Sequence, residues 1–435
     1  PAGALVTRSD GSRARTICLD QLPTPMAAPS AAADRVVGGP RLGDTGVVTD
    51  LPAGVPGPPD MPHVSYVLAD LDTGAIIAAK NAHAQLLPAS TLKTLLALVV
   101  MPALDPQTEV VGADEDTRAE GTRVGITVGG KYTVDNLLNG LILVSGNDAA
   151  YALARAYGGK SRLLADMNAK AASLGAWDTV AVDPSGLDAD GQHSSSYDLA
   201  LIGRAVMQLP DYRRRAALQR TTFPGGLVTP TPTIGRANGK PVAGAATLVE
   251  GPPFEIANHN PLLGIYPGLI GVKSGYTSLA RNTYVGAVTH EGRTLLVAEM
   301  GSPEPQVHST PALLDWGFAY AAQARPVGRL VAPGEVPTAP NSIATTAPSA
   351  SLTSQSQDQG PTAATQSPET STSTPRPIEH LFTEAVRDWW ASLPEWARWI
   401  IPAGTVLLIG LIGALANALL RRRRRSVSVR GRFQR

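Results

Sequence analysis

Three short stretches follow one another in this chain: Ser90-Thr91-Leu92-Lys93, then Ser145-Gly146-Asn147, then Lys273-Ser274-Gly275. Each stretch alone is weak, because a serine three residues before a lysine arises easily by chance. All three in this order, each in a suitable local context, are specific. Together they describe a serine acyl-transfer site whose proton acceptor is lysine rather than histidine.

The first stretch opens a predicted helix. Pro88 and Ala89 precede an apolar, helix-favouring run over residues 92–100, so a helix is expected to begin near Ser90. Positions i and i+3 share a helix face, which brings Lys93 beside the Ser90 hydroxyl. A lysine accepts a proton only if burial or a second cation destabilises its ammonium form. The alternative is a capping serine followed by a surface lysine.

The second stretch lies beyond an apolar helix that is expected to start at Thr133. The break after this helix places a hydroxyl and an amide on one turn. Ser145 could relay a proton between Lys93 and a leaving amine, and Asn147 could bind a substrate carbonyl. The alternative is a helix C-cap with Gly146 in the left-handed conformation, and both interpretations can hold together.

The third stretch lies in an apolar run with strand character, residues 269–277. Gly275 removes a side chain where a substrate backbone could lie alongside as an extra strand. Lys273 would supply the second cation that a basic lysine needs and would attract a carboxylate. Ser274 and Thr277 offer hydroxyls to the same carboxylate. The alternative is a strand that ends in a glycine turn.

With these motifs the chain resembles a serine D-alanyl-D-alanine carboxypeptidase, a low-molecular-mass penicillin-binding protein. The similarity covers about residues 62–322 and includes the stretches 67–75, 146–150, 184–188, 196–200, 258–263 and 314–318. The resemblance implies that Ser90 is the acylated nucleophile and Lys93 the general base. It implies that Ser145 and Asn147 form the second catalytic wall.

The same resemblance implies a substrate-binding strand. Lys273 and Ser274 would bind the terminal carboxylate of the substrate, beside Gly275 and Thr277. The backbone N–H groups of Ser90 and Tyr276 would form the oxyanion hole. The substrate implied is a peptidoglycan stem peptide that ends in D-Ala-D-Ala, β-lactams would be covalent inhibitors, and no cofactor or metal is needed.

Three features depart from the family pattern. Ser274 stands where threonine is commoner, which keeps the hydroxyl. Leu279-Ala280-Arg281 follows Thr277, where the family usually has two small residues and a glycine. Residues 302–308 contain no arginine, although carboxypeptidases of this group often carry one there to grip the substrate carboxylate. Arg281 is a candidate substitute.

A serine β-lactamase is the nearest alternative. The class A type uses a glutamate, with an asparagine four residues later, to activate water. The glutamates between the second and third motifs are Glu250 and Glu255, which are followed at that spacing by Phe254 and His259. A β-lactam is therefore expected to acylate this protein and stay bound.

Composition favours an exported enzyme. The net charge of +1 over 435 residues argues against nucleic acid as a partner. The single cysteine, Cys18, lies outside the predicted domain, so no disulfide framework forms within the monomer. The seven histidines show no metal-ligand spacing. The chain has no G-x-S-x-G elbow, which argues against an α/β-hydrolase.

The predicted fold class is α/β (α+β), with the penicillin-binding-protein/serine β-lactamase-like fold that the resemblance implies. A five-stranded antiparallel sheet is expected from strands 65–71, 75–80, 269–277, 282–289 and 294–301. A mainly helical subdomain is inserted over residues 90–209, and a closing helix over 310–322 flanks the sheet. The motifs would converge in the cleft between the two parts. Residues 221–253 are predicted to be a loop-rich insertion.

Composition divides the chain into six segments. These are a Pro/Gly/Ala-rich unstructured arm (1–60), the catalytic domain (61–325), a disordered Ser/Thr/Pro stalk (326–378), a Trp-rich juxtamembrane segment (379–398), a transmembrane helix (399–420) and a basic cytoplasmic tail (421–435). The missing initiator Met and apolar leader are expected to reflect a removed signal peptide.

The predicted membrane span, residues 399–420, is an uncharged apolar stretch of 22 residues. Four of the six tryptophans crowd its upstream edge, as in an interfacial belt: Trp389, Trp390, Trp396 and Trp399. Five consecutive arginines, Arg421 to Arg425, follow it. The positive-inside rule then predicts a single-pass cell-membrane protein with a cytoplasmic C-terminus and an extracytoplasmic catalytic domain.

The sequence thus predicts a membrane-anchored serine DD-carboxypeptidase that trims terminal D-alanine through an acyl-enzyme on Ser90. Transfer of the acyl group to an amine would make it a transpeptidase, and cutting a cross-link would make it an endopeptidase. The non-enzyme alternative is a penicillin-binding wall scaffold, and the five polar side chains of the motifs argue against it.

Overall fold

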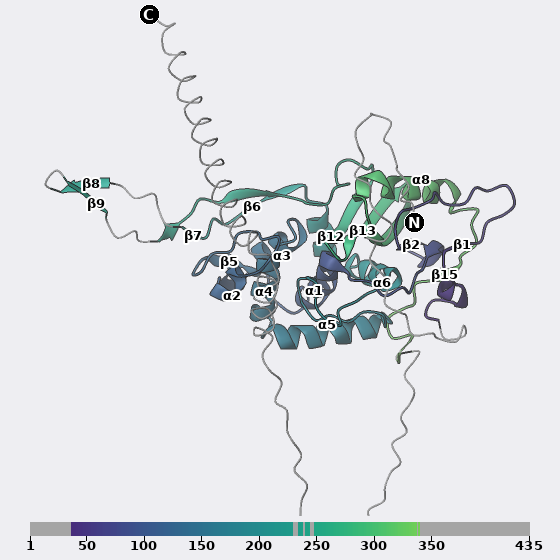
Figure 1. Cartoon of the computed structure of the whole chain (residues 1–435), viewed down its shortest axis with the longest axis horizontal. Coiled ribbons are helices and arrows are strands. Elements are labelled where there is room, and N and C mark those ends of the chain that lie inside the picture. Colours follow the sequence, from purple (N-terminus) through teal and green to yellow (C-terminus); the bar gives the residue numbers. More distant parts are fainter. Residues whose placement is uncertain (1–35, 229–233, 238–239, 244–247, 337, 340–435) are drawn as a thin grey trace, which may run out of the picture. The chain divides into compact units, whose positions relative to one another are not determined.

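The computed structural model describes residues 36–228, 234–237, 240–243, 248–336 and 338–339 (Figure 1). The chain divides into two compact units, Pro1–Ala347 and Pro348–Arg435, and every described residue belongs to the first. Cys18, most of the predicted stalk and all of residues 379–435 lie outside the described residues. Within the described ranges no helix is both long enough and apolar enough to cross a bilayer.

One antiparallel sheet organises the described unit (Figure 1). Its strands are β1 (Val47–Thr49), β2 (Ser65–Asp70), β3 (Ala75–Lys80), β12 (Leu269–Thr277), β13 (Arg281–His290), β14 (Arg293–Ser302) and β15 (Gly328–Arg329). The spatial order is β1-β3-β2-β14-β13-β12, and β15 also pairs with β3. Pairing of β14 with β2 joins the two ends of the domain. As a result β12, which carries the third motif, is an edge strand.

The sheet has seven strands, whereas the sequence predicts five. All five predicted strands are present, and the first and last residues of each lie within one residue of the prediction. The missed strands are β1, inside the segment predicted to be an unstructured arm, and β15, beyond the predicted domain end. Strands of three and two residues are too short to show alternation. The neighbouring Leu42 and Leu330 are buried in the core, so the packed domain extends past residues 61–325 at both ends.

The helices form the second part of the unit. They are α1 (Lys93–Val100), α2 (Asp114–Thr117), α3 (Val134–Ile142), α4 (Asn147–Ala156), α5 (Lys160–Leu174), α6 (Ser196–Val206), α7 (Pro210–Ala216) and α8 (Thr310–Tyr320), with 3-10 turns at Pro40–Gly43, Ala89–Leu92 and Gln306–His308. A short ribbon of β4 (Glu109–Val111) and β5 (Lys131–Thr133) precedes α3. The predicted helical insertion and closing helix are therefore both present.

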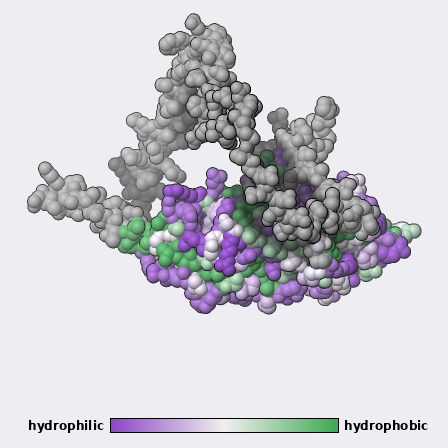
Figure 2. Space-filling model, turned by 90° about the horizontal axis from the view of Figure 1, so that it is seen from below, coloured by the Kyte–Doolittle hydropathy of each residue, from purple (hydrophilic) through white to green (hydrophobic). Residues whose placement is uncertain are grey.

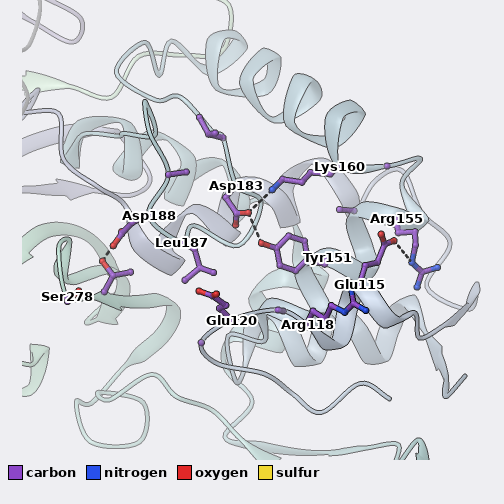
Figure 3. A pocket seen from close by; sticks show the side chains of 17 residues that line it. Glu115, Arg118, Glu120, Tyr151, Arg155, Lys160, Asp183, Leu187, Asp188 and Ser278 are labelled. Atoms are coloured by element: carbon purple, nitrogen blue, oxygen red, sulfur yellow. Dashed lines mark hydrogen bonds and ion pairs between the residues drawn. The ribbon is translucent and has the colours of Figure 1, made fainter. Parts of the chain in front are cut away.

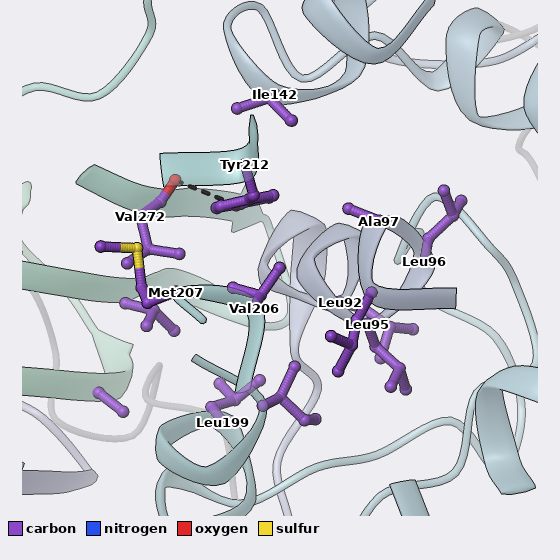
Figure 4. Close-up of a cluster of buried hydrophobic side chains, with 14 of the residues drawn as sticks. Leu92, Leu95, Leu96, Ala97, Ile142, Leu199, Val206, Met207, Tyr212 and Val272 are labelled. Carbon is purple, nitrogen blue, oxygen red and sulfur yellow. Dashed lines mark hydrogen bonds between the residues drawn. The ribbon is translucent and has the colours of Figure 1, made fainter. Parts of the chain in front are cut away.

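Helix α1 is the centre of the core. All eight of its residues are buried, because its sequence is apolar on nearly every side. Figure 4 shows Leu95 and Leu96 of this helix in the same cluster as Leu199 and Val206 of α6 and Val272 of β12. Helix α8 belongs to a second cluster that contains side chains from β2, β13 and β14. This packing fixes the start of α1 beside the edge strand.

The predicted loop-rich insertion is largely a series of two-stranded ribbons. They pair β6 (Arg220–Phe223) with β11 (Phe254–Ala257), β7 (Leu227–Val228) with β10 (Val249–Glu250), and β8 (Ile234–Ala237) with β9 (Lys240–Ala243). At the base the Leu227 N–H donates to Thr127 Oγ1 at 2.7 Å. Val228, Leu248 and Phe254 are exposed on this insertion, and Figure 2 shows apolar and hydrophilic areas interspersed over one face of the described surface.

Candidate active site

The first motif lies where the chain turns into α1. Ser90 belongs to the 3-10 turn Ala89–Leu92, and the α-helix proper begins at Lys93, three residues later than predicted. Ala89 takes a φ of 48°, which is uncommon for a residue with a side chain and turns the chain sharply just before Ser90. The i, i+3 relation still holds, because Lys93 Nζ donates to Ser90 Oγ at 2.9 Å.

Lys93 is buried and its Nζ has three acceptors. Besides Ser90 Oγ, Nζ donates to Asn147 Oδ1 at 2.7 Å and to the Ser185 carbonyl at 2.6 Å. Burial, followed by the charge of Lys273, lowers the pKa of Lys93 well below its ordinary value. A neutral amine donates only two of these bonds and keeps one lone pair. That lone pair can face Ser90 Oγ, so the same contact can run in reverse and remove the serine proton.

The second motif is a strained turn between α3 and α4. Thr133 caps α3 as predicted, because Asn136 N donates to Thr133 Oγ1 at 3.1 Å. The left-handed residue after the helix is Ser145, with a φ of 63°, whereas Gly146 has a φ of −58°. The alternative interpretation, a C-cap with a left-handed Gly146, is therefore not what the structure has. Backbone strain of this kind at a polar residue is typical of functional sites.

The two polar side chains of this motif differ in their contacts. Asn147 begins α4, and its Nδ2 donates to the Glu120 carbonyl at 2.6 Å, which turns Oδ1 towards Lys93. Ser145 Oγ is buried and has no hydrogen-bond partner among the described residues. An unpaired buried hydroxyl is unfavourable by about 1–3 kcal/mol, so it is available to a ligand or a proton in transit.

The third motif brings the edge strand against the nucleophile. A Cβ on Gly275 would lie 2.7 Å from Ser90 N and 2.6 Å from Thr283 Oγ1, so only glycine allows this approach. Lys273 is buried, and burial lowers its pKa to about 7. Its Nζ donates to the Ser274 carbonyl at 2.7 Å. On an edge strand alternate backbone groups point away from the sheet, which leaves them available to an incoming peptide.

The remaining predicted residues of this strand differ in exposure. Ser274 Oγ donates to the His259 carbonyl at 3.5 Å. Tyr276 is 61% exposed. Thr277 Oγ1 donates to Asp188 Oδ1 at 2.9 Å, so its hydroxyl already has an acceptor that the sequence did not predict. Arg281 has a φ of 59° and lies across from Thr277 in the β12–β13 register.

The loop of residues 183–188 completes the surroundings of Lys93. Its Ser185 carbonyl accepts from Lys93, and Asp183 holds Ser185 from behind. Gly186 has a φ of 81°, and a Cβ there would lie 2.0 Å from the Ala89 carbonyl. The family-like stretch 184–188 was the available signal, but a backbone carbonyl leaves no mark in a sequence.

A cleft of about 1040 Å³ reaches the end of β12 at Thr277 (Figure 3). Ser90, Lys93, Ser145, Asn147 and Lys273 are not among its lining residues. Its lining includes Thr277, Asp188 and Asp183, together with Tyr151 of α4 and Lys160 of α5. The described residues contain no group of three or more histidine, cysteine or carboxylate side chains that could hold a metal ion.

Comparisons with known proteins identify the family of this chain. The sequence profile of the D-alanyl-D-alanine carboxypeptidase family (Peptidase_S11) matches residues 54–223, which contain the first two motifs. The chain is 41% identical over 281 residues to the D-alanyl-D-alanine carboxypeptidase DacB2 of Mycobacterium tuberculosis, covering 63% of this chain and 88% of DacB2. The chain belongs to the D-alanyl-D-alanine carboxypeptidase family. The sequence-based prediction of a serine-type D-Ala-D-Ala carboxypeptidase is thereby confirmed at the level of family and enzyme class.

Solved structures support the predicted fold. A D-alanyl-D-alanine carboxypeptidase from Mycobacterium tuberculosis H37Rv aligns with a TM-score of 0.55 and 41% identity, over 64% of this chain and 99% of that one. A variant of the Streptomyces K15 DD-transpeptidase aligns with a TM-score of 0.52 and 26% identity, over 60% of this chain and 99% of that one. The α+β fold of penicillin-binding proteins is therefore confirmed for the catalytic domain.

Proposed function

We propose that this carboxypeptidase is anchored in the cell membrane and trims terminal D-alanine from peptidoglycan stem peptides through an acyl-enzyme on Ser90. The observation that carries the proposal is the 2.9 Å contact between Ser90 Oγ and the buried Lys93 Nζ. A lysine at this place has a lowered pKa and an acceptor lone pair. The direct test is the release of free D-alanine from a D-Ala-D-Ala peptide by the purified protein.

The proposed reaction has two halves. Neutral Lys93 removes the proton of Ser90, and Oγ attacks the carbonyl of the penultimate D-alanine. The backbone N–H groups of Ser90 and Tyr276 stabilise the oxyanion. Terminal D-alanine leaves with a proton that returns from Lys93 through the unpaired Ser145 hydroxyl. Water then attacks the ester, Lys93 accepts its proton, and Ser90 is restored.

Substrate binding is proposed along β12. A stem peptide would add to this edge strand, where Gly275 leaves room beside Ser90. The positive charge of Lys273 repels a proton on Lys93, so Lys93 is neutral while Lys273 is protonated. Protonated Lys273 then attracts the terminal carboxylate of the substrate. Penicillin has a carboxylate and a reactive carbonyl in a similar arrangement, so covalent inhibition is part of the proposal.

Carboxylate recognition is expected to discriminate weakly, because residues 302–308 contain no arginine. A hydrogen bond to a charged group contributes about 1.5–3 kcal/mol, so loss of a clamp reduces the preference roughly ten- to a hundredfold. The expected result is a small ratio of kcat/KM between a stem peptide with free D-alanine and its C-terminal amide. The ratio is measured for wild type and Arg281→Ala. A thousandfold preference for the free acid in both proteins would contradict this prediction.

Two other reactions share the acyl-enzyme. The 26% identity to the Streptomyces K15 DD-transpeptidase keeps transfer to an amine as the second candidate, and endopeptidase cleavage differs only in the leaving group. A β-lactamase is less favoured. Glu255 is an exposed ion-pair partner of Arg220 on the ribbon insertion, and Glu250 is exposed as well. A non-catalytic scaffold would not need a buried lysine at 2.9 Å from a serine hydroxyl.

The anchor is proposed from sequence. The apolar span 399–420, the tryptophans before it and the five arginines after it support one crossing with the C-terminus in the cytoplasm. The catalytic domain would then face the extracytoplasmic side, where its substrate lies. The Ser/Thr/Pro composition of the intervening segment supports a long tether.

Truncation after Ala339 tests this anchor. The cut retains Val336, whose carbonyl accepts from Trp177 Nε1 at 3.1 Å and so belongs to the folded domain. The truncated protein is expected to be soluble and monomeric and to react with penicillin as the full chain does. Fractionation of cells that express either form shows whether the protein is in the membrane or the soluble fraction, and the full chain is the control. Pelleting of the truncated form with membranes at ordinary salt would contradict the prediction and indicate a second attachment surface.

A further inference from the structure

We propose that Asp183 and Lys160 are a positioning pair for the catalytic base, holding the Ser185 carbonyl against Lys93 and adjusting the charge around it. The proposal rests on the proposed function of Lys93. Neither residue belongs to the three motifs, and both line the cleft that reaches Thr277 (Figure 3).

Asp183 bonds in two directions at once. Its Oδ1 accepts from Ser185 N at 2.9 Å and from Ser185 Oγ at 2.5 Å. Its Oδ2 accepts from Tyr151 OH at 2.7 Å and from Lys160 Nζ at 2.9 Å. The Ser185 carbonyl in turn accepts from Lys93 Nζ at 2.6 Å. One carboxylate therefore connects the cleft wall to the catalytic amine through a single residue.

The loop that carries this connection is fixed on several sides. Gln192 Oε1 accepts from the Asp183 N–H at 2.8 Å. Gly186 packs against the Ala89 carbonyl so closely that no side chain fits. Because the loop abuts the residue before Ser90, a shift of Asp183 would displace the Ser185 carbonyl relative to both members of the catalytic pair.

The charged groups that face Lys93 come from three elements. Lys273 on β12 lowers its pKa, whereas Asp183 in this loop and Asp148 on α4 raise it. Asp148 is occupied by backbone N–H groups of residues 124–126 and of Ala149. Replacing Asp148 would remove the acceptor of the backbone of residues 124–126. The negative charge of Asp183 can instead be changed indirectly, through the Lys160 side chain that balances it.

Lys160 is the accessible member of the pair. Its side chain is 49% exposed, whereas that of Asp183 is 9% exposed. Burial opposes ionisation of Asp183, but bonds from Ser185, Tyr151 and Lys160 outweigh it and keep its pKa below the ordinary value. Asp183 is thus charged at neutral pH. Burial and the bond to Asp183 raise the pKa of Tyr151, which stays neutral.

The two substitutions are expected to shift the pH dependence of acylation in opposite directions. Lys93 acts as a base only when neutral, so acylation rises with pH as Lys93 loses its proton. Removing the negative charge of Asp183 destabilises protonated Lys93 and moves this rise to lower pH. Removing the positive charge of Lys160 leaves Asp183 unbalanced, stabilises protonated Lys93 and moves the rise to higher pH. Loss of packing alone would not shift the pH of this rise in opposite directions for the two variants.

The experiment is the rate constant of penicillin acylation as a function of pH for full-length wild type, Asp183→Asn, Lys160→Met and Tyr151→Phe. The midpoint of the rise is expected to move down for Asp183→Asn and up for Lys160→Met, each by roughly half to one pH unit, since neither charge touches Lys93 directly. Tyr151→Phe keeps both charges and is expected to leave the midpoint in place.

Each outcome bears on the proposal. Variants that lower the maximal rate while the midpoint stays at the wild-type pH would show that Asp183 only supports the loop, which overturns the positioning role. Midpoints that move in the same direction would overturn it as well. If Asp183→Asn does not fold, the upward shift of Lys160→Met decides alone. Wild type that forms no adduct at Ser90 would instead overturn the proposed function itself.

Discussion

Ser90→Ala is expected to abolish both penicillin labelling and the release of D-alanine, with a loss of about 10³-fold or more in kcat/KM. Ser90 Oγ is the only atom of this residue that can form the acyl ester, and its contact with Lys93 Nζ at 2.9 Å disappears with it. The measurement is turnover of a D-Ala-D-Ala peptide, with labelling by a fluorescent penicillin in parallel.

Ser173→Ala is the matched control for that variant. Ser173 is an exposed serine near the end of α5, and among the described residues its hydroxyl bonds the carbonyl of Lys170 alone. This control is expected to keep wild-type labelling and turnover. Undiminished labelling of Ser90→Ala would show that another residue is the nucleophile.

Lys93→Arg is expected to lose about 10²–10⁴-fold in the rate of acylation. A guanidinium stays protonated at neutral pH and cannot remove the proton of Ser90. It is also too large for the buried space that Nζ shares with Asn147 and Ser185. The rate of penicillin acylation measures this loss.

Lys93→Met is the control for bulk, since methionine is close to lysine in length and has no charge. It is expected to be equally inactive because it has no base, and thermal unfolding checks that it is folded. Its stability reflects two opposing effects: loss of a buried amine, and loss of the donor to Asn147 Oδ1 and the Ser185 carbonyl. Full acylation by Lys93→Arg would mean that another residue serves as the base.

The main strands could be predicted because they are apolar runs bounded by turn residues. β2, β3 and β14 are buried on both faces, so such runs, and not alternation, are their signal. β2 and β3 flank Asp72-Thr73-Gly74, and β13 and β14 flank Glu291-Gly292, each pair within one residue of its prediction. β1 and β15 could not be predicted, since three or two residues carry no periodicity and are extended only because β3 offers a free edge. Composition therefore predicted a domain, residues 61–325, that is too short at both ends.

The candidate site shows a similar division. Side chains that do chemistry occur in recognisable strings, and the structure brings Ser90, Lys93 and Asn147 into contact. The carbonyl of Ser185 could not be predicted, because it is a backbone atom 92 residues from Lys93 and any residue type supplies one. The left-handed residue of the turn is Ser145, although glycine is the residue that favours this conformation. At Gly146 a Cβ would lie 2.8 Å from Asp148 Oδ1, so the glycine is needed for space.

The most direct test of the acyl-enzyme account is mass spectrometry of the purified protein after incubation with penicillin, followed by peptide mapping. The account predicts one stable adduct with the mass of the intact drug, on the peptide that contains Ser90, because opening of the β-lactam ring leaves no fragment to depart. An adduct on any other serine, or no adduct on the folded wild-type protein, would contradict it.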